Sequence, residues 1–313
     1  MGFTWAKTRA TEPVPEDTRA PGIVFAMPAK YIGAHMPGGK GMAKAVRAGK
    51  EIGCTAVQVF TSSPQNWHAP ETTDKAVAEF DAARRETKID VIVSHDGYLI
   101  NLCAPDEELR RKSIDGLKGE MGRCEAFGIK WTVSHVGAHM GQGEEEGVRI
   151  AAEGIRQVLA ETSPEVTLLM ETTAGQGSSL NYRFEHLARL IDLVGGPERQ
   201  CVCLDTCHVF AAGYDIRTAE TYEATMAEFE RLVGFERLKA VHCNDSKKAF
   251  GSRVDRHEHI GKGFIGEEAF RLLMNDSRFD TIPILLETPD AETMHQVNLK
   301  KLRALQRKRK PSA

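Results

Sequence analysis

Short apolar runs alternate with long amphipathic stretches along most of the chain, and this alternation limits the folds that it can adopt. The runs are rich in β-branched and aliphatic residues, which favour strands, whereas the stretches between them have the periodicity of helices. Strands that alternate with helices pair in parallel. The eight runs are YIGAH (31–35), AVQVF (56–60), VIVSH (91–95), WTVSH (131–135), VTLLME (166–171), CVCLD (201–205), LKAVH (238–242) and IPILLE (282–287).

The eight strand-helix units span about 260 residues, from Tyr31 to about Pro289, which is near the ~250 residues typical of a (β/α)8 barrel. We therefore predict an α/β fold with a single (β/α)8 TIM barrel over residues 23–300. A Pro-containing flexible arm (1–22) and a basic tail (301–313) are expected to lie outside the barrel. An open doubly wound sheet is the alternative, but no GxGxxG or GxxxxGK(S/T) phosphate loop follows an early strand.

Six consecutive runs end in His, Asp or Glu, at intervals of 34 to 45 residues. Parallel strands point the same way, so these six residues should meet at the carboxyl face of the barrel, where barrel enzymes have their active sites. Burying so many imidazoles and carboxylates together without a cation would be costly, which predicts a metal site. With two neighbouring segments, CH and DRH, the candidate donors are His95, His135, Glu171, Asp205, His208, His242, Asp255, His257 and Glu287.

The run CVCLD places thiols next to these donors. Side chains alternate along a strand, so Cys201 and Cys203 should lie beneath Asp205, inside the barrel. We expect these two thiols to pack in the core rather than bind metal. Cys207 is expected in the loop that follows the strand.

The composition is that of an ordinary globular protein. The formal net charge of -3 and the pI of about 6.4 give no overall nucleic-acid signature, so contact with DNA would depend on a local positive surface. Seven Cys without a regular framework indicate a reducing compartment. No run reaches the ~18 apolar residues of a membrane span, so we expect a cytoplasmic protein.

Several long motifs resemble those of the endonuclease IV family, the trinuclear zinc apurinic/apyrimidinic endonucleases. The resemblance extends from about Tyr31 to Thr288 and implies a xylose-isomerase-like TIM barrel. The motifs that carry it are SHDGYLINL, ETTAGQGSSL, CVCLDTCHVFAAGYD, HCNDSKKAFGSRVDRHEHIGKGFIG and ILLET.

The resemblance also implies how three Zn²⁺ ions would be held, with Mn²⁺ or Fe²⁺ as possible replacements in some sites. His95 and His135 would bind the first ion with Glu171, which bridges to the second. Asp205, His242 and Glu287 would complete the second site. His208, Asp255 and His257 would form the third.

The activity implied by the resemblance is metal-assisted hydrolysis of the phosphodiester on the 5′ side of an abasic site in double-stranded DNA, and 3′-repair activity is possible. Glu171 and Glu287 would be the catalytic residues, and the enzyme is expected to act as a monomer. Gln65 stands where relatives often have Arg, which is expected to weaken minor-groove insertion. The expected DNA contacts are Tyr98, Leu99, Gln65, Arg253, Arg256 and Lys262.

Two other functions fit parts of this pattern. A metal-dependent sugar isomerase or epimerase would use strand-end His, Asp and Glu on the same barrel, but such enzymes generally need one or two metals. A damage-binding protein without catalysis would not need the complete donor set. The remaining histidines divide into three that are expected to be solvated (His68, His186 and His295) and three that could contact ligand residues (His35, His139 and His259).

Overall fold

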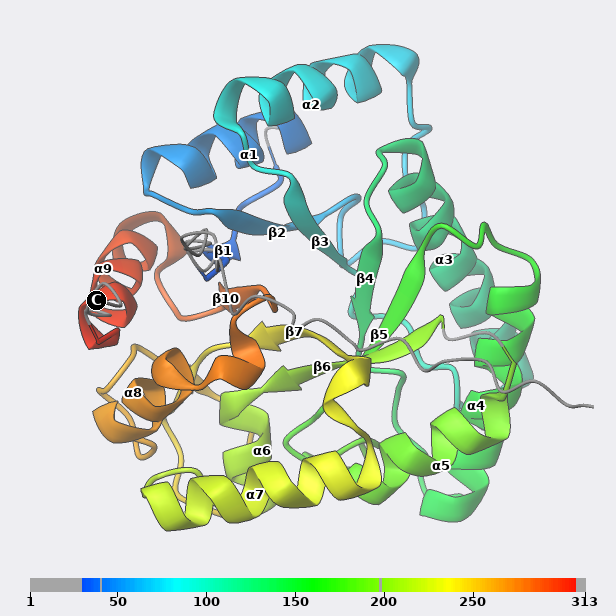
Figure 1. The fold of residues 1–313 in the computed structure, drawn as a ribbon. Coiled ribbons are helices and arrows are strands. Elements are labelled where there is room, and N and C mark those ends of the chain that lie inside the picture. The colour runs from blue at the N-terminus through cyan, green and yellow to red at the C-terminus, as the bar shows by residue number, and fades with distance from the viewer. Residues whose placement is uncertain (1–29, 40, 197–198, 308–313) are drawn as a thin grey trace, which may run out of the picture.

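A computed structural model describes residues 30–39, 41–196 and 199–307. Eight parallel strands close into a barrel in the order β1-β10-β7-β6-β5-β4-β3-β2, and helices surround it (Figure 1). The predicted (β/α)8 TIM barrel is therefore confirmed. Its strands are β1 (Ile32–His35), β2 (Ala56–Phe60), β3 (Val91–His95), β4 (Trp131–Ser134), β5 (Thr167–Glu171), β6 (Gln200–Asp205), β7 (Leu238–His242) and β10 (Ile284–Leu286).

The outer layer consists of helices that follow the strands, and a short antiparallel hairpin of β8 (Asp245–Ser246) and β9 (His257–Glu258) follows β7. Its helices are α1 (Met42–Glu51), α2 (Asp74–Thr87), α3 (Glu107–Ala126), α4 (Glu144–Ala160), α5 (Phe184–Val194), α6 (Thr206–Ala212), α7 (Ala219–Leu232), α8 (Glu267–Asn275) and α9 (Ala291–Leu305). None of the helices in these described ranges is long and apolar enough to cross a membrane.

Polar side chains mark where several helices begin. The Asp106 carboxylate accepts a hydrogen bond from the backbone N–H of Leu109 at 2.7 Å and caps α3, a contact typically worth about 1 kcal/mol. Glu107 and Glu108 follow in the first turn, where negative charge is favourable. Thr218 and Thr221 form a reciprocal capping box at the start of α7.

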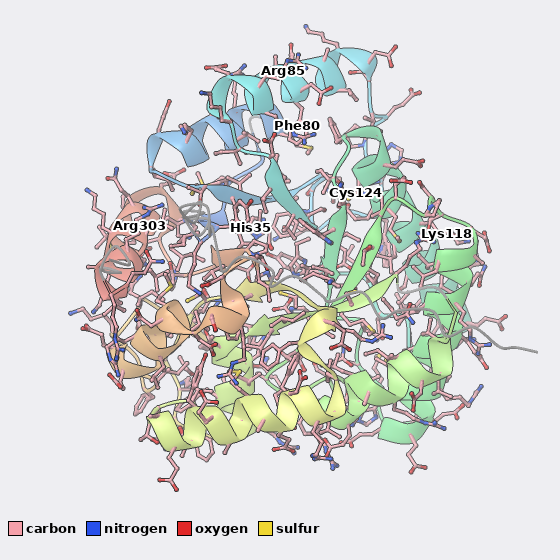
Figure 2. The ribbon with its side chains drawn as sticks, viewed as in Figure 1. His35, Phe80, Arg85, Lys118, Cys124 and Arg303 are labelled. Atoms are coloured by element: carbon pink, nitrogen blue, oxygen red, sulfur yellow. The ribbon has the colours of Figure 1, made fainter. Side chains whose placement is uncertain are left out.

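Two layers of packing follow from the alternation of side chains along the strands. Residues that point inward fill the barrel, and those that point outward pack against the helices. In Figure 2, Phe80 and Cys124 lie between helices and barrel, whereas Arg85 and Lys118 lie at the periphery. The inward layer comprises Ala56, Val93, Val133, Leu169, Cys201, Cys203, Ala240 and Leu285. The prediction that Cys201 and Cys203 pack inside the barrel is thus confirmed.

The structure differs from the sequence-based expectation at Cys207. Cys207 lies in α6 rather than in a loop, because the Asp205 carboxylate caps a helix that begins at Thr206. Helix α9 extends to Leu305, into the basic segment, and Leu302 is fully buried in the core. The arm expected over residues 1–22 lies outside the described residues, as does the end of the basic tail.

Candidate metal centre

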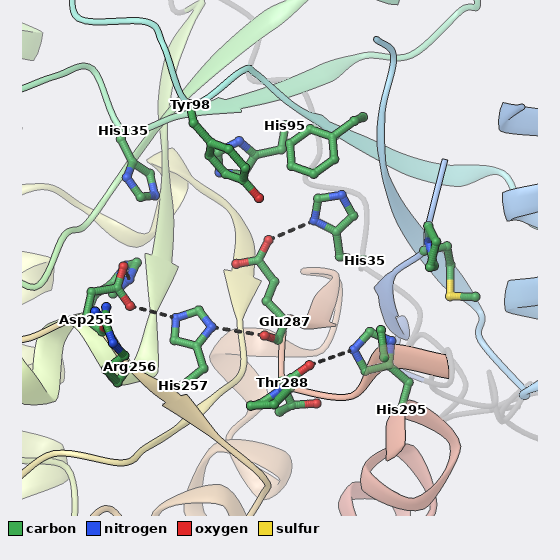
Figure 3. Close-up of a pocket in the computed structure, with 16 residues that line it drawn as sticks. His35, His95, Tyr98, His135, Asp255, Arg256, His257, Glu287, Thr288 and His295 are labelled. Atoms are coloured by element: carbon green, nitrogen blue, oxygen red, sulfur yellow. Dashed lines mark hydrogen bonds and ion pairs between the residues drawn. The ribbon is translucent and has the colours of Figure 1, made fainter. Parts of the chain in front are cut away.

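The carboxyl ends of the barrel strands surround a cavity of about 600 Å³. His95, Glu171, Asp205 and His242 are the last residues of β3, β5, β6 and β7. His135 and Glu287 each follow the last residue of a strand, β4 and β10 respectively. Figure 3 shows His35, His95, His135 and His257 around the cavity with Glu287 between them. The parallel barrel therefore brings together residues that are far apart in sequence.

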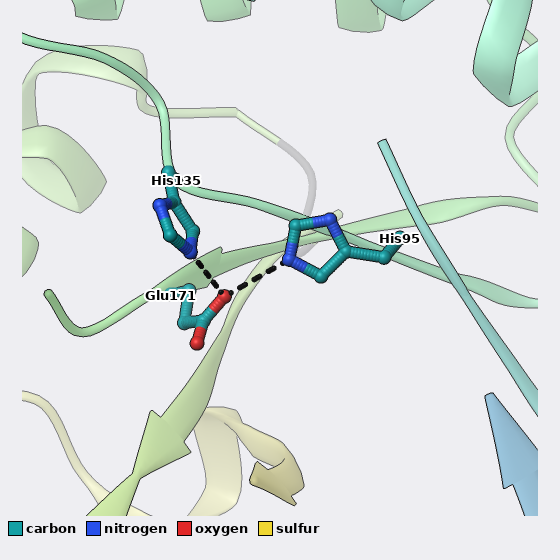
Figure 4. Close-up of side chains that lie close together, drawn as sticks. All are labelled: His95, His135 and Glu171. Carbon is teal, nitrogen blue, oxygen red and sulfur yellow. Dashed lines mark hydrogen bonds and ion pairs between the residues drawn. The ribbon is translucent and has the colours of Figure 1, made fainter. Parts of the chain in front are cut away.

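Glu171 lies at the centre of this group. Its side chain is fully buried, and its Oε2 atom is 3.2 Å from His95 Nε2 and 3.0 Å from His135 Nε2 (Figure 4). Its other oxygen, Oε1, lies 2.8 Å from His242 Nδ1 and 3.2 Å from His208 Nδ1. One carboxylate thus faces histidines from both sides, which is the arrangement that a bridging ligand needs.

The nine candidate donors form three compact groups, in each of which the potential ligand atoms lie within 4.8 Å of one another. His95, His135 and Glu171 make one group, and His208, Asp255 and His257 make another. The third contains Glu171 together with Asp205, His242 and Glu287. The donors that the resemblance assigns to each ion thus lie close together, and a fourth group among the described residues contains Asp205, Cys207 and His257.

Asp205 and His208 are positioned by one local structure. Asp205 Oδ1 accepts a hydrogen bond from the backbone N–H of His208 at 2.8 Å and so caps the short helix α6. The cap directs the His208 ring into the cavity one turn after the strand ends. This explains why two candidate metal ligands, Asp205 and His208, stand three residues apart at the end of β6.

Three of the histidine rings are oriented by backbone carbonyls, which leave one ring nitrogen of each histidine facing the cavity. Nδ1 of His95, His208 and His257 lies 3.0, 2.8 and 3.1 Å from the carbonyl oxygens of Asp96, Thr172 and Glu287. A carbonyl can only accept, so each Nδ1 carries a proton, and in the neutral ring the lone pair is on Nε2. Such an orienting hydrogen bond is what metal-binding histidines usually have.

Two buried nitrogens test whether these residues fit a metal ion. His208 Nε2 is 3.1 Å from Asp255 Oδ2, and His257 Nε2 is 3.4 Å from Asp255 Oδ1. Neither nitrogen makes a hydrogen bond with the described part of the chain. Buried nitrogens that face carboxylates without a hydrogen bond are costly unless something else lies between them. A cation satisfies them, so the donor set fits divalent metal.

The electrostatics of the metal-free site pair charged imidazoles with carboxylates. Burial opposes protonation of His95, but Asp96 and Glu171 outweigh it and raise the pKa well above its usual value. Burial is likewise outweighed by carboxylates at His208 and His242, whose pKa values are also raised. Burial would raise the pKa of Glu171, but the neighbouring histidines hold it well below the usual range.

Metal binding is therefore expected to release protons. The raised pKa values of His95, His208 and His242 favour the protonated imidazoles in the metal-free protein, and a cation must displace those protons. We expect on the order of one to three protons released per protein, and an affinity for metal that falls as the pH is lowered. Calorimetric titration with Zn²⁺ in two buffers of different ionisation enthalpy measures this number; equal heats in both buffers would contradict it.

Cys207 approaches the centre although its neighbours in the strand do not. Its sulfur lies within 4.8 Å of the donor atoms of Asp205 and His257. It donates a hydrogen bond to the carbonyl of Arg256 at 3.7 Å, and burial raises the pKa of the thiol to about 12. In the metal-free structure this thiol is therefore protonated and directed at a backbone carbonyl, whereas the nine His, Asp and Glu donors face one another.

Three residues that hold the donors were missed or left open by the sequence. Asn244 is fully buried; its amide nitrogen donates to Asp205 Oδ2 at 2.7 Å, and its oxygen accepts from the Glu287 N–H. Gln58 contacts both His242 and Glu287, and His35 Nδ1 lies 3.0 Å from Glu287 Oε1. For Gln58, the available signal was a lone polar residue at an inward position of an otherwise apolar strand.

The other histidines correct part of the sequence interpretation. His186 is buried, with Nε2 3.1 Å from Glu144 and Nδ1 accepting from the Asn181 N–H, so it is not solvated. His295 is also buried and lies 3.3 Å from the Thr288 carbonyl; burial lowers its pKa to about 4. His68 is exposed, as expected.

The residues expected to contact DNA lie on loops that follow β2, β3 and β7, and two of them, Tyr98 and Arg256, line the cavity. Tyr98 is 65% exposed and lines the cavity, and Leu99 is exposed beside it. The Tyr98 N–H donates to the Pro64 carbonyl at 2.9 Å, which ties this loop to the one that carries exposed Gln65. Three basic residues follow β7, namely Arg253, Arg256 and Lys262, and Arg256 also lines the cavity.

Comparison with known proteins places these features in context. A family model described as a xylose isomerase-like TIM barrel matches residues 46–306. A protein of Chloroflexus aggregans described as probable endonuclease 4 is 50% identical over 279 residues, which covers 88% of this chain and 98% of that protein.

Solved structures agree with these sequence matches. The crystal structure of endonuclease IV from Thermus thermophilus aligns with a TM-score of 0.78 at 35% identity, over 88% of this chain and 98% of that one. A 3-keto-D-glucoside 4-epimerase from E. coli aligns with a TM-score of 0.63 at 16% identity, over 88% and 99% of the two chains. The likeness to the epimerase concerns the fold alone.

Proposed function

Because the chain belongs to the endonuclease IV family, we propose that it is a DNA-repair endonuclease that hydrolyses the phosphodiester on the 5′ side of an abasic site. The products are a 3′ hydroxyl and a 5′ deoxyribose phosphate. The observation that carries this proposal is the gathering of nine His, Asp and Glu donors at the carboxyl end of the barrel. The enzyme is further proposed to depend on zinc and to act as a monomer.

The three donor groups are proposed to hold three Zn²⁺ ions, with Glu171 shared between two of them. Bound divalent cations supply charge that stabilises the reacting phosphate and lower the pKa of a water molecule. The four carboxylates of the site contribute -4 against +6 from three such ions, so the loaded cavity is positive in an acidic protein. A phosphodiester anion is the substrate group that this charge favours.

The chain's own residues have separate tasks in this proposal. Glu171 presents one oxygen to the His95 and His135 side and the other to the His242 side, and so fixes the spacing of the donor groups. Glu287 Oε1 is held by His35 and Gln58, which leaves Oε2 directed at the centre. We assign the catalytic roles to these two glutamates, Glu171 as bridge and Glu287 as an orienting carboxylate.

Exposed residues around the cavity are proposed to bind the damaged duplex. Tyr98, which lines the cavity, and its neighbour Leu99 are both exposed, and such side chains are suited to entering an opened base stack. Arg256 and Lys262 offer positive charge to phosphates, and Arg253 is stacked over the Tyr182 ring at 4.3 Å. Exposed Gln65, on the adjoining loop, lacks the charge of an Arg and contributes less to affinity.

A single incubation separates this function from a sugar epimerase. A duplex with one abasic site is expected to be nicked at that site, whereas an intact duplex of the same sequence should remain uncut. Denaturing electrophoresis against 5′-labelled markers identifies the side of cleavage. Epimerisation of ketohexoses by the metal-loaded protein, without incision of the abasic duplex, would overturn the proposal in favour of the epimerase.

A further inference from the structure

Gln58 occupies an unusual place for a polar side chain. It is the middle residue of β2 and is completely buried. Its side chain points to the same side of the strand as Ala56, which belongs to the apolar layer inside the barrel. A buried amide at such a position costs free energy unless both of its ends are hydrogen-bonded. Its partners therefore explain why it is tolerated there.

Both ends of the Gln58 amide contact candidate metal ligands. Nε2 lies 2.6 Å from Glu287 Oε1, and Oε1 lies 2.7 Å from His242 Nε2. Glu287 follows β10 and His242 ends β7. In the barrel, β1 lies between β2 and β10, and β7 is the next strand after β10. One side chain thus connects two donors that are separated by 45 residues in the sequence.

The chemistry of the partners allows one orientation of this amide. An ionised carboxylate can only accept hydrogen bonds, so the amide N–H must face Glu287. The amide oxygen then faces His242 Nε2, which must carry a proton to donate to it. In the neutral ring the lone pair of His242 is consequently on Nδ1, the nitrogen that lies 2.8 Å from Glu171 and 3.3 Å from Glu287 Oε2.

His242 differs in this respect from the other histidines of the centre. His95, His208 and His257 present Nε2 and are oriented by backbone carbonyls, which no side-chain substitution removes. His242 presents Nδ1 and is oriented by a side chain. The orientation of this one ligand therefore depends on the identity of residue 58.

We propose that Gln58 is a positioning residue, which fixes the ring tautomer of His242 and turns Glu287 Oε2 toward the metal centre. The assignment rests on the proposed metal-dependent function of the same cavity. It adds a residue that binds neither metal nor DNA itself but sets how two ligands present their donor atoms. His35 lies at the Glu287 end only, where its Nδ1 is 3.0 Å from the same Glu287 oxygen and 3.0 Å from Gln58 Nε2.

Replacing the amide should weaken metal binding without disturbing the fold. Gln58→Leu removes both hydrogen bonds and fills the space with apolar atoms. Loss of the group that orients a metal ligand typically lowers metal affinity or activity by about 10- to 100-fold. We expect a loss of that size in Zn²⁺ affinity, measured by competition with a chromogenic chelator. With DNA, kcat should fall by a similar factor while KM for the abasic duplex stays unchanged, because the DNA-contacting loops are untouched.

Gln58→Glu separates the two hydrogen bonds and retains the shape of the side chain. It keeps an oxygen for the His242 N–H but replaces the donor to Glu287 with another oxygen, so Zn²⁺ affinity should fall by less than in Gln58→Leu. Thr132→Val is the matched control, since Thr132 is a fully buried strand residue outside the metal centre. It should bind Zn²⁺ as the wild type does. Melting of the metal-free proteins reports whether each variant is folded.

The outcomes separate this inference from the proposed function. Wild-type Zn²⁺ affinity in Gln58→Leu would overturn the role of Gln58. If Gln58→Leu does not fold, wild-type Zn²⁺ affinity in Gln58→Glu would overturn it instead. Reduced affinity in Gln58→Leu with KM unchanged and the Thr132→Val control unaffected would support it. A wild-type protein that binds Zn²⁺ but leaves abasic DNA uncut would contradict the proposed function, and the comparison of Zn²⁺ affinities would still decide on Gln58.

Discussion

Replacing Glu171 with alanine is expected to leave a folded barrel that incises an abasic duplex at least about 1,000-fold more slowly than the wild type. Glu171 is shared by two of the three groups that consist of His, Asp and Glu among the described residues. Its removal deprives both groups of an oxygen and leaves His95, His135, His208 and His242 without the carboxylate that they face. Such a change affects the chemistry directly.

The measurement is single-turnover incision with enzyme in excess over labelled duplex. Circular dichroism and thermal melting of the metal-free protein serve as folding controls, and Glu171→Gln provides a variant of the same shape without the charge. His208→Ala, which removes a donor from the group with Asp255 and His257, should also lose most activity. Incision by either alanine variant within tenfold of the wild-type rate would remove the proposed mechanism.

Removing the metal from the wild type is expected to abolish incision and to lower the melting temperature by about 10 °C. Ligand that binds only the native state at ~1,000 times its Kd adds about 4 kcal/mol of stability. For a domain of this size each kcal/mol corresponds to roughly 2–4 °C in Tm. A cation should bind the native state selectively, because only the folded chain brings the carboxylates and imidazoles of the cavity together.

Dialysis against a chelator, followed by stepwise return of Zn²⁺, tests this expectation. Activity and Tm should rise together as metal is restored. The Glu171→Ala variant is the control, since its Tm should respond far less to Zn²⁺. A chelated protein that keeps full activity, with the metal verified as absent by elemental analysis, would contradict the metal-dependent account.

The strand-end donors could be predicted from the sequence because of a simple regularity. Six of the eight strand-helix units contribute one donor at their carboxyl ends, and parallel pairing forces those ends together. His95 on β3 and Glu171 on β5 therefore meet although 76 residues separate them. The inward position of Cys203 followed from the two-residue alternation of the same strands.

Other features depend on contacts that no local pattern records. Gln58 hydrogen-bonds to His242 and Glu287 at sequence separations of 184 and 229 residues, and its role emerges only when the barrel closes. His186, which is buried, contacts Glu144 on α4, a different helix. His208 lies on a helix because the Asp205 carboxylate caps that helix. The sequence predicted Asp205 as a metal ligand but gave no sign of this second role.

Anomalous X-ray scattering recorded on both sides of the zinc absorption edge tests the central claim most directly. For crystals grown with Zn²⁺, we predict three peaks at the carboxyl end of the barrel, one within each of the three donor groups, with Cys207 Sγ outside bonding distance of all of them. A map without peaks in this cavity, or with Cys207 as a direct ligand, would contradict the account.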